Sequence, residues 1–285
     1  MARYIEINDL NLDELAPYVR LTGAQLRSTL DPDRALIIAE SPTVIGVALD
    51  RGCIPVSILT DKRLINSDVR GIIERLDSMG FDVPVYTGER DLLASITGFE
   101  LTRGALAAFK RPRENNIREI LSTARRVAVL EEIADSTNIG AIFRSAAALG
   151  VDAVLVTPTC CDPFSRRAIR VSMGTAFMIP WCYIGKAKED WPSKGMSLLS
   201  EYGFKTVAMA LSDNSVSIDD PCLDEEKLAI ILGTEGTGLK SETIKEADFV
   251  TRIPMSRGVD SLNVGAAAAI AFYRLCRKND IDSVP

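Results

Sequence analysis

The 285-residue chain contains no histidine. Imidazole is the general base of Ser-His-Asp and Cys-His hydrolases and the commonest zinc ligand, so its absence excludes those mechanisms and any histidine-ligated metal site. The sequence also lacks an apolar run of about 18 residues, which a membrane-spanning helix needs. Its first residues, Met1–Glu6, lack the apolar core of a signal peptide. We therefore expect a soluble, cytoplasmic protein without a membrane or metal partner.

The sequence also lacks the cysteine spacing that is typical of a disulfide-bonded protein. The six cysteines are scattered and include no C-x-x-C pair. In a chain of this length, that pattern favours reduced thiols over a disulfide framework. The adjacent Cys160 and Cys161 leave a redox pair or a soft-metal site as alternatives, although no second cluster supports either.

The net charge of −6 argues against a nucleic-acid partner, because neutralising phosphates drives most of that affinity. Basic residues nevertheless gather locally. Seven lysines and arginines lie between Arg103 and Arg126 against two glutamates, and Arg166, Arg167 and Arg170 form a second cluster. These clusters are either ordinary solvated faces or contacts for an RNA backbone, and charge alone leaves both readings open.

Strand-like and helix-like segments alternate along the chain, a pattern typical of an α/β protein with a mostly parallel sheet. Residues 1–112 are predicted to form a first α/β unit, and the proline- and charge-rich segment 113–125 a linker with a short helix. Residues 126–285 are predicted to form a second unit, with strands at 127–130, 153–156, 177–180, 206–210, 228–232 and 249–254. A long helix is predicted from Asn263 to about Lys278.

Three segments of the second unit place glycine and small polar residues between an apolar strand and a helix: Asp135–Gly150, Ile230–Leu239 and Ile253–Gly265. Open α/β sheets bind ligands at this edge, and glycines let a ligand approach the backbone closely. Arg144 lies on the first turns of a predicted helix, where the helix dipole disfavours a cation. That position favours the binding of an anion, such as a phosphate.

Together these segments carry a resemblance. Asn138-x-Gly-x-x-x-Arg144, Leu232-Gly-Thr-Glu-Gly-x-Gly-Leu239 and Ile253-Pro-Met-x5-Ser-Leu-Asn-Val264 resemble the three motifs of the SpoU (TrmH) family of RNA 2′-O-ribose methyltransferases, in the SPOUT superfamily. The resemblance covers about residues 126–278. It implies an α/β domain with a deep trefoil knot, S-adenosylmethionine as cofactor, rRNA or tRNA as substrate, and a homodimer that shares its site between subunits. Residues 1–112 are similar to the L30e-like RNA-binding domain of many such enzymes, closing with Thr102–Pro112.

The resemblance also implies roles for individual residues. Those implied to bind the cofactor are Gly233, Ile253 and Leu262, with Thr234, Gly238 and Met255. Those implied to surround the reacting groups are Arg144, Asn138, Glu235, Ser261 and Asn263. The sequence departs from the family at Arg257, where glycine is usual, and at Gly265, where serine or alanine is commoner.

The expected reaction suits a chain without histidine. A sulfonium is a good leaving group, so the protein needs mainly to align the ribose hydroxyl and ease the loss of one proton. The resemblance implies that Arg144 contacts the target phosphate and helps deprotonate the hydroxyl. Because a guanidinium has a pKa above ~12, positioning is the better founded of these two roles.

Two alternatives come from other classes. A catalytically idle RNA-binding protein on the same scaffold would have no physical need for the polar set Asn138, Arg144, Glu235 and Asn263. A base methyltransferase of the wider knotted superfamily is disfavoured by the Asn-x-Gly-x-x-x-Arg segment. The sequence leaves open which RNA and nucleotide are modified, and whether the role is housekeeping or antibiotic resistance.

Overall fold

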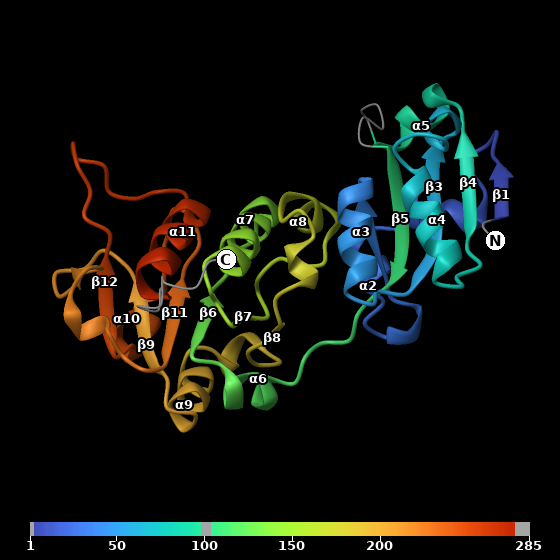
Figure 1. Cartoon of the computed structure of the whole chain (residues 1–285). Coiled ribbons are helices and arrows are strands. Elements are labelled where there is room, and N and C mark those ends of the chain that lie inside the picture. The colour runs from blue at the N-terminus through green and yellow to red at the C-terminus, as the bar shows by residue number, and fades with distance from the viewer. Residues whose placement is uncertain (1–2, 98–103, 277–285) are drawn as a thin grey trace, which may run out of the picture. The chain divides into compact units, whose positions relative to one another are not determined.

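The computed structural model describes residues 3–97 and 104–276, which form two compact units (Figure 1). Unit 1 comprises the chain up to Arg113 together with Phe164–Phe177, and unit 2 comprises Glu114–Pro163 and the chain from Met178. The segment Phe164–Phe177 follows a strand of unit 2 in the sequence without a compositional break. The sequence pattern therefore does not indicate that this segment belongs to unit 1.

Unit 1 is built on a mixed five-stranded sheet of order β1-β4-β3-β5-β2. Strands β1 (Arg3–Glu6), β4 (Pro84–Gly88) and β3 (Pro55–Asp61) are parallel, and β5 (Ala105–Lys110) runs antiparallel to β3 and to β2 (Leu36–Glu40). Its helices are α1 (Ala16–Val19), α2 (Gly23–Arg27), α3 (Pro42–Asp50), α4 (Arg70–Ser78), α5 (Arg90–Thr97) and α8 (Arg166–Val171). Of the segment Thr102–Pro112, Thr102 and Arg103 lie outside the described residues.

Unit 2 contains a seven-stranded sheet of order β10-β12-β9-β11-β6-β7-β8, and all its paired strands within the described residues are parallel. The strands are β6 (Arg126–Leu130), β7 (Ala153–Val156), β8 (Trp181–Tyr183), β9 (Lys205–Met209), β10 (Val216–Ser217), β11 (Leu228–Leu232) and β12 (Phe249–Arg252). The prediction of an α/β fold with a mostly parallel sheet is confirmed. Parallel pairing also brings the carboxyl ends of neighbouring strands to one edge of the sheet.

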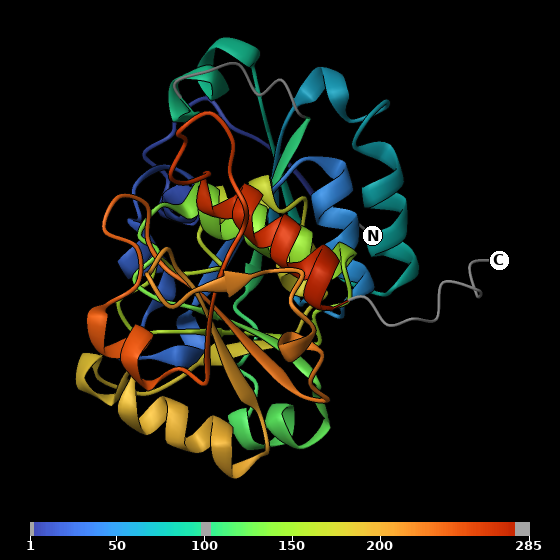
Figure 2. The ribbon, with the colours of Figure 1, turned by 90° about the vertical axis from the view of Figure 1, so that its left-hand side faces the viewer.

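Helices cover both faces of this sheet (Figures 1 and 2). Helices α7 (Ser136–Ala148) and α11 (Val264–Leu275) lie together on one face, and α6 (Ile117–Thr123), α9 (Ser193–Glu201) and α10 (Ser241–Glu246) pack on the other. Ile120 and Leu121 of α6 belong to the buried core of that second face. The short helix of the segment 113–125 is therefore part of the packing of unit 2.

One strand prediction is wrong. Residues 177–180 were expected to form a strand, but Thr175–Phe177 form a 3-10 turn and the strand begins at Trp181. Pro180 carries no N–H for a ladder, although its carbonyl accepts from Val154 N at 3.0 Å, so regular pairing with β7 starts only after the proline. The predicted continuation of the last helix through Arg277 and Lys278 lies outside the described residues.

None of the six cysteines, all of which lie within the described residues, forms a disulfide. Cys160 is buried, and its thiol donates to the carbonyl of Leu130 at 3.1 Å, while Cys161 is a separate, half-buried side chain. Within residues 3–97 and 104–276, no cluster of three His, Cys, Asp or Glu side chains could hold a metal ion. The helices of the same residues include none that is both long and apolar enough to cross a membrane.

Candidate functional site

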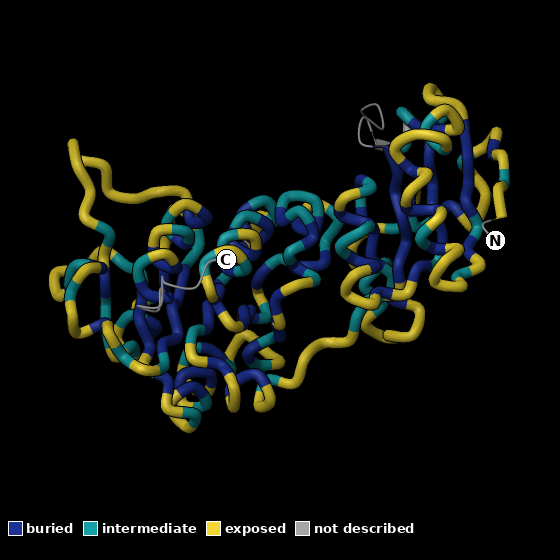
Figure 3. The backbone as a smooth tube through the Cα atoms, viewed as in Figure 1, coloured by how far each residue is buried: buried dark blue, intermediate teal, exposed yellow. Residues whose placement is uncertain are grey.

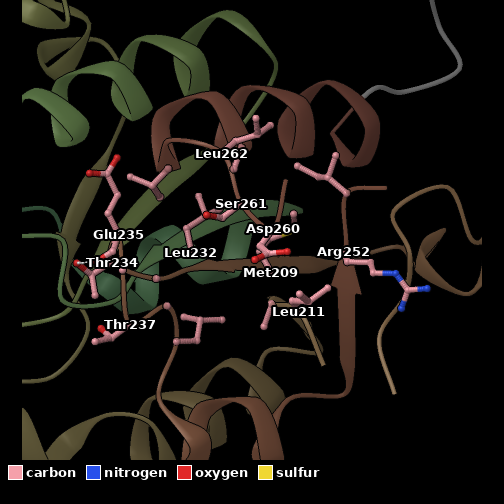
Figure 4. Close-up of a pocket in the computed structure, with 18 of the residues that line it drawn as sticks. Met209, Leu211, Leu232, Thr234, Glu235, Thr237, Arg252, Asp260, Ser261 and Leu262 are labelled. Carbon is pink, nitrogen blue, oxygen red and sulfur yellow. Dashed lines mark hydrogen bonds between the residues drawn. The ribbon is translucent and has the colours of Figure 1, made fainter. Parts of the chain in front are cut away.

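A cavity of about 660 Å³ opens at the carboxyl edge of the unit 2 sheet (Figure 4). Its walls are the ends of β9, β11 and β12 and the start of α11, with lining residues in 209–211, 232–239, 251–255 and 260–264. The volume lies within the range of small-molecule and cofactor sites. Two of the three motif segments therefore form one hollow, and the third lies beside it.

The loop Gly233–Leu239, here called the glycine loop, follows β11. A Cβ atom on Gly233 would lie 2.6 Å from the carbonyl carbon of Gly238 and from the nitrogen of Leu239, so only glycine fits. Gly238 N donates to Thr234 O at 3.1 Å, which closes the base of the loop. Gly236 has a φ of 90° and Gly238 a φ of 69°, in the left-handed region that favours glycine. The loop thus presents backbone groups to the cavity.

The segment between β12 and α11 forms the opposite wall and is mostly exposed, as its yellow trace in Figure 3 shows. Its turn passes through Arg257 and Gly258, which both adopt a left-handed conformation, with φ values of 59° and 72°. An arginine at such a position carries a strain that glycine avoids, which accounts for the family's usual glycine.

The second departure, Gly265, has a packing reason. A Cβ atom there would lie 3.0 Å from the Cβ of Ala141, because α11 crosses α7 very closely at this point. The absent side chain lets the two helices approach. The starts of α7 and α11, which carry Asn138 and Asn263, are thereby held together.

Asn263 is the centre of a polar cluster that joins all three motif segments. Its Oδ1 caps α11 by accepting from the backbone N–H of Gly265 at 2.9 Å and of Ala266 at 3.3 Å. Because the cap fixes which end of the amide carries oxygen, Nδ2 points to the cluster. It donates to Oδ1 of buried Asn138 at 2.9 Å and to Oε1 of Glu235.

The structure brings together most of the predicted site residues. All six residues expected to bind the cofactor line the cavity, as do three of those expected around the reacting groups: Gly233, Ile253, Leu262, Thr234, Gly238, Met255, Glu235, Ser261 and Asn263. Figure 4 shows Thr234 and Glu235 from the glycine loop and Ser261 from the opposite wall around one hollow. Asn138 does not line the cavity but reaches it through Asn263.

Arg144 lies apart from this cavity. It is exposed on α7, and its guanidinium makes no hydrogen bond or ion pair with any residue that the structure describes. An arginine without a partner keeps its full hydrogen-bonding capacity for a ligand.

Sequence reasoning missed a third stretch of the wall, Met209–Leu211 at the end of β9, because no glycine or polar motif marks it. It also missed Asp260 and Arg252. The Arg252 guanidinium donates from one nitrogen to Ser215 O at 2.6 Å and Ser215 Oγ at 2.8 Å, and Figure 4 shows it turned away from the other labelled side chains. Asp260 lies among those side chains and adds a carboxylate to the wall.

Comparison with known proteins agrees with this geometry. Residues 125–273, which include all three motif segments, match the SpoU rRNA Methylase family. The chain belongs to this family. The resemblance seen in the three motifs is therefore confirmed over about half of the chain.

Similarity to individual proteins extends over more of the chain. An uncharacterised tRNA/rRNA methyltransferase of Mycobacterium bovis is 39% identical over 260 residues, which cover 90% of this chain and 86% of that protein. The 23S rRNA (guanosine(2553)-2′-O)-methyltransferase of Bacillus subtilis is 30% identical over 193 residues, covering 68% of this chain and 73% of that one.

Among solved structures, an AdoMet-bound rRNA methyltransferase from Sinorhizobium meliloti has a TM-score of 0.77 at 23% identity and covers 95% of this chain and 97% of its own. The SpoU methyltransferase AviRb from Streptomyces viridochromogenes, also with AdoMet, has a TM-score of 0.73 at 18% identity and covers 92% and 96%. At these identities the likeness concerns the fold, and it extends over nearly the whole chain.

Proposed function

We propose that this SpoU-family protein transfers a methyl group from S-adenosylmethionine to a ribose 2′-hydroxyl of rRNA or tRNA. The observation that carries the proposal is the polar cluster in which Asn263 joins Asn138 and Glu235 at the wall of the cavity. A cofactor cavity beside oriented polar side chains is what a methyl transfer to a hydroxyl requires. The 2′-O-methyltransferase activity named for the Bacillus subtilis relative supports the same chemistry.

S-adenosylmethionine is the cofactor, and the cavity suits it. Gly233 and Gly238 let the adenine approach backbone N–H and C=O groups, and the apolar side chains of Ile253, Met255 and Leu262 can flank an aromatic base. When bound, the cofactor supplies a methyl group on a sulfonium. The AdoMet-bound Sinorhizobium meliloti structure, which has the same fold, supports this assignment.

The protein's own residues orient the acceptor and handle its proton. Arg144, exposed and without a partner among the described residues, positions the phosphate beside the target ribose. Within the cluster, Glu235 is the side chain that can accept a proton, and Asn263 fixes the direction of its carboxylate. Ser261, also on the cavity wall, is placed to hydrogen-bond the ribose. We assign these roles to Arg144, Glu235, Asn263 and Ser261, with Asn138 orienting Asn263.

The active form is a homodimer in which the second subunit completes the site. Two features support this proposal. Arg144 lies outside the cavity of its own chain. In addition, large apolar side chains are exposed on the segment between β12 and α11 and on α11 itself: Met255, Leu262, Ile270 and Tyr273. Full activity of a monomer at micromolar concentration would contradict the shared site.

We extend the proposal to the whole chain as the family resemblance implies. Residues 1–112 are an L30e-like domain that selects the RNA, residues 113–125 a connection, and residues 126–285 a methyltransferase domain whose chain passes through a trefoil knot. Lys110, Arg111 and Arg113 of the first basic cluster and Arg167 of the second are the contacts that an RNA backbone would use. The protein acts in the cytoplasm, where rRNA and tRNA are modified.

The test is direct. Purified protein is incubated with methyl-labelled S-adenosylmethionine and unmodified total RNA, the RNA is digested, and the labelled nucleoside is identified. A 2′-O-methylated nucleoside establishes the reaction, and its base narrows the target. A labelled base would contradict ribose methylation, and no label with cofactor bound would favour an idle scaffold.

The Asn263→Asp variant separates the two functions of this side chain. An aspartate still caps α11, so the melting temperature should change little. It loses the donor to Asn138 and sets a second carboxylate against Glu235, so the single-turnover methylation rate should fall roughly 10- to 100-fold, the equivalent of one lost charge-assisted hydrogen bond.

Asn116→Asp is the matched control for Asn263→Asp. Asn116 caps α6 in the same way, accepting from Arg118 N at 2.9 Å, but it contacts no predicted site residue. We expect wild-type rates from it. Equal rates for both variants and the wild type would remove Asn263 from the reaction centre.

A further inference from the structure

Glu131 is a buried carboxylate that lies next to the glycine loop without lining the cavity. It directly follows β6 and is only 1% exposed. Its backbone N–H donates to Leu232 O at 2.9 Å. Leu232 is the last residue of β11 and the one that enters the glycine loop, so the main chain of Glu131 is fixed to the start of that loop.

The side chain of Glu131 reaches the other end of the same loop. Oε1 accepts from the backbone N–H of Lys240 at 2.7 Å, and Lys240 follows Leu239. Oε2 accepts from the hydroxyl of Thr243 on α10 and from the indole Nε1 of Trp191 at 2.5 Å. One residue therefore holds both the entry and the exit of the glycine loop.

No ion pair with any residue in 3–97 or 104–276 accounts for the burial of this carboxylate. The ammonium group of Lys240 turns instead to Glu132, whose Oε1 lies 2.9 Å from Nζ. The three groups that bond to Glu131 are a backbone amide, an indole and a hydroxyl, each of which makes a charge-assisted hydrogen bond. A buried charge costs stability that an apolar side chain of similar volume would not, so packing alone does not explain a glutamate here.

The glycine loop depends on its ends for its position. The main-chain hydrogen bond within it is the one from Gly238 to Thr234, and it contains glycines at three of its seven positions. Glycines lose more conformational freedom on ordering than other residues. Apart from the hydrogen bond that the Glu235 side chain accepts from Asn263, a loop of this composition is held in one conformation largely by the contacts at its two ends.

We propose that Glu131 is a positioning residue that sets the affinity for the cofactor by clamping both ends of the glycine loop, with Thr243 and Trp191 as its partners. The inference rests on the proposed function, in which this loop binds S-adenosylmethionine. Glu131 itself touches neither cofactor nor RNA. Its loss acts through the loop and therefore on cofactor binding first.

The experiment uses the full-length protein and measures the Kd of S-adenosylmethionine by calorimetry for wild type, Glu131→Gln, Thr243→Val and Thr243→Ser. A glutamine side chain cannot accept hydrogen bonds on both of its terminal atoms, because its NH₂ group would face a hydrogen-bond donor. Valine keeps the shape of threonine but loses the hydroxyl, whereas serine keeps the hydroxyl. We expect Kd to rise about tenfold or more in the Gln and Val variants, the equivalent of one charge-assisted hydrogen bond, and to stay near wild type in the Ser variant.

Kinetics separates this role from a merely structural one. The KM for S-adenosylmethionine should rise in Glu131→Gln and Thr243→Val, while kcat at saturating cofactor and the KM for RNA change far less. Glu132→Gln is the matched control, since it removes a half-exposed ion pair to the same Lys240 and should shift Kd by no more than about twofold.

Two results would overturn the inference. If Thr243→Val binds the cofactor like wild type, or if Thr243→Ser loses as much affinity as Thr243→Val, the hydroxyl contact to Glu131 does not set cofactor affinity. The comparison of Thr243→Val with Thr243→Ser decides the question even if Glu131→Gln fails to fold. Failure of the wild type to bind S-adenosylmethionine would instead refute the proposed function itself.

Discussion

Replacing Arg144 with alanine is expected to lower methyl transfer roughly 100-fold or more, the range that a positioned acid, base or phosphate contact supplies. Cofactor binding should be unchanged, because Arg144 does not line the cavity. Folding should also be unchanged, since the guanidinium has no partner within the described chain. The measurement is single-turnover methylation at saturating cofactor, with calorimetry of S-adenosylmethionine alongside.

Arg125→Ala is the control for this variant. Arg125 is another exposed arginine of unit 2, but it precedes β6 and so lies at the amino edge of the parallel sheet, away from the cavity. We expect it to keep near-wild-type turnover. Arg144→Lys restores the charge without the planar fork and should recover only part of the rate. Near-normal turnover by Arg144→Ala with cofactor bound would place the catalytic centre elsewhere.

Replacing Gly233 with alanine should abolish most cofactor binding. The new methyl group would lie 2.6 Å from backbone atoms of Gly238 and Leu239, and neither can rotate away as a side chain could. The base of the glycine loop must open. Overpacking of this kind costs about 1–3 kcal/mol, so we expect a loss of roughly 10- to 100-fold in affinity for S-adenosylmethionine. Calorimetry measures the affinity, and thermal unfolding the cost to the fold.

Gly71→Ala gives the comparison for Gly233→Ala. Gly71 lies on α4 of unit 1, where an added Cβ meets nothing within 4 Å and the backbone is helical. Alanine there should leave cofactor affinity unchanged and stability equal or slightly higher. A Gly233→Ala protein that binds S-adenosylmethionine like wild type would show that the glycine loop does not contact the cofactor.

The parts of the site that could be predicted from the sequence are those whose positions are set by residues nearby in the chain. The glycine loop and the start of α11 follow apolar strands directly, so their positions at the sheet edge came from the pattern of residues 230–239 and 253–265. Local chemistry also explains a helix boundary in unit 1. Helix α1 ends at Val19 and α2 begins at Gly23, because Thr22 and Gln25 form a capping box that starts a new helix.

The parts that could not be predicted depend on which strands are neighbours. Met209–Leu211 enters the cavity wall only because β9 lies between β11 and β12, and no local pattern sets that order. The partners of Glu131 are likewise distant, at 60 residues for Trp191 and 112 for Thr243. A buried carboxylate in an apolar run has no sequence signature until the topology brings its donors to it.

The cap that Asn263 provides also bears on where a proton can travel. With Oδ1 committed to the first turn of α11, Nδ2 is turned to Glu235 and donates to its Oε1. A hydrogen bond donated to a carboxylate oxygen makes that oxygen less basic than its neighbour. Under the proposed function, a proton that Glu235 takes from a hydroxyl therefore goes preferentially to Oε2, so the fold of one helix makes the two oxygens of this carboxylate unequal in acid-base exchange.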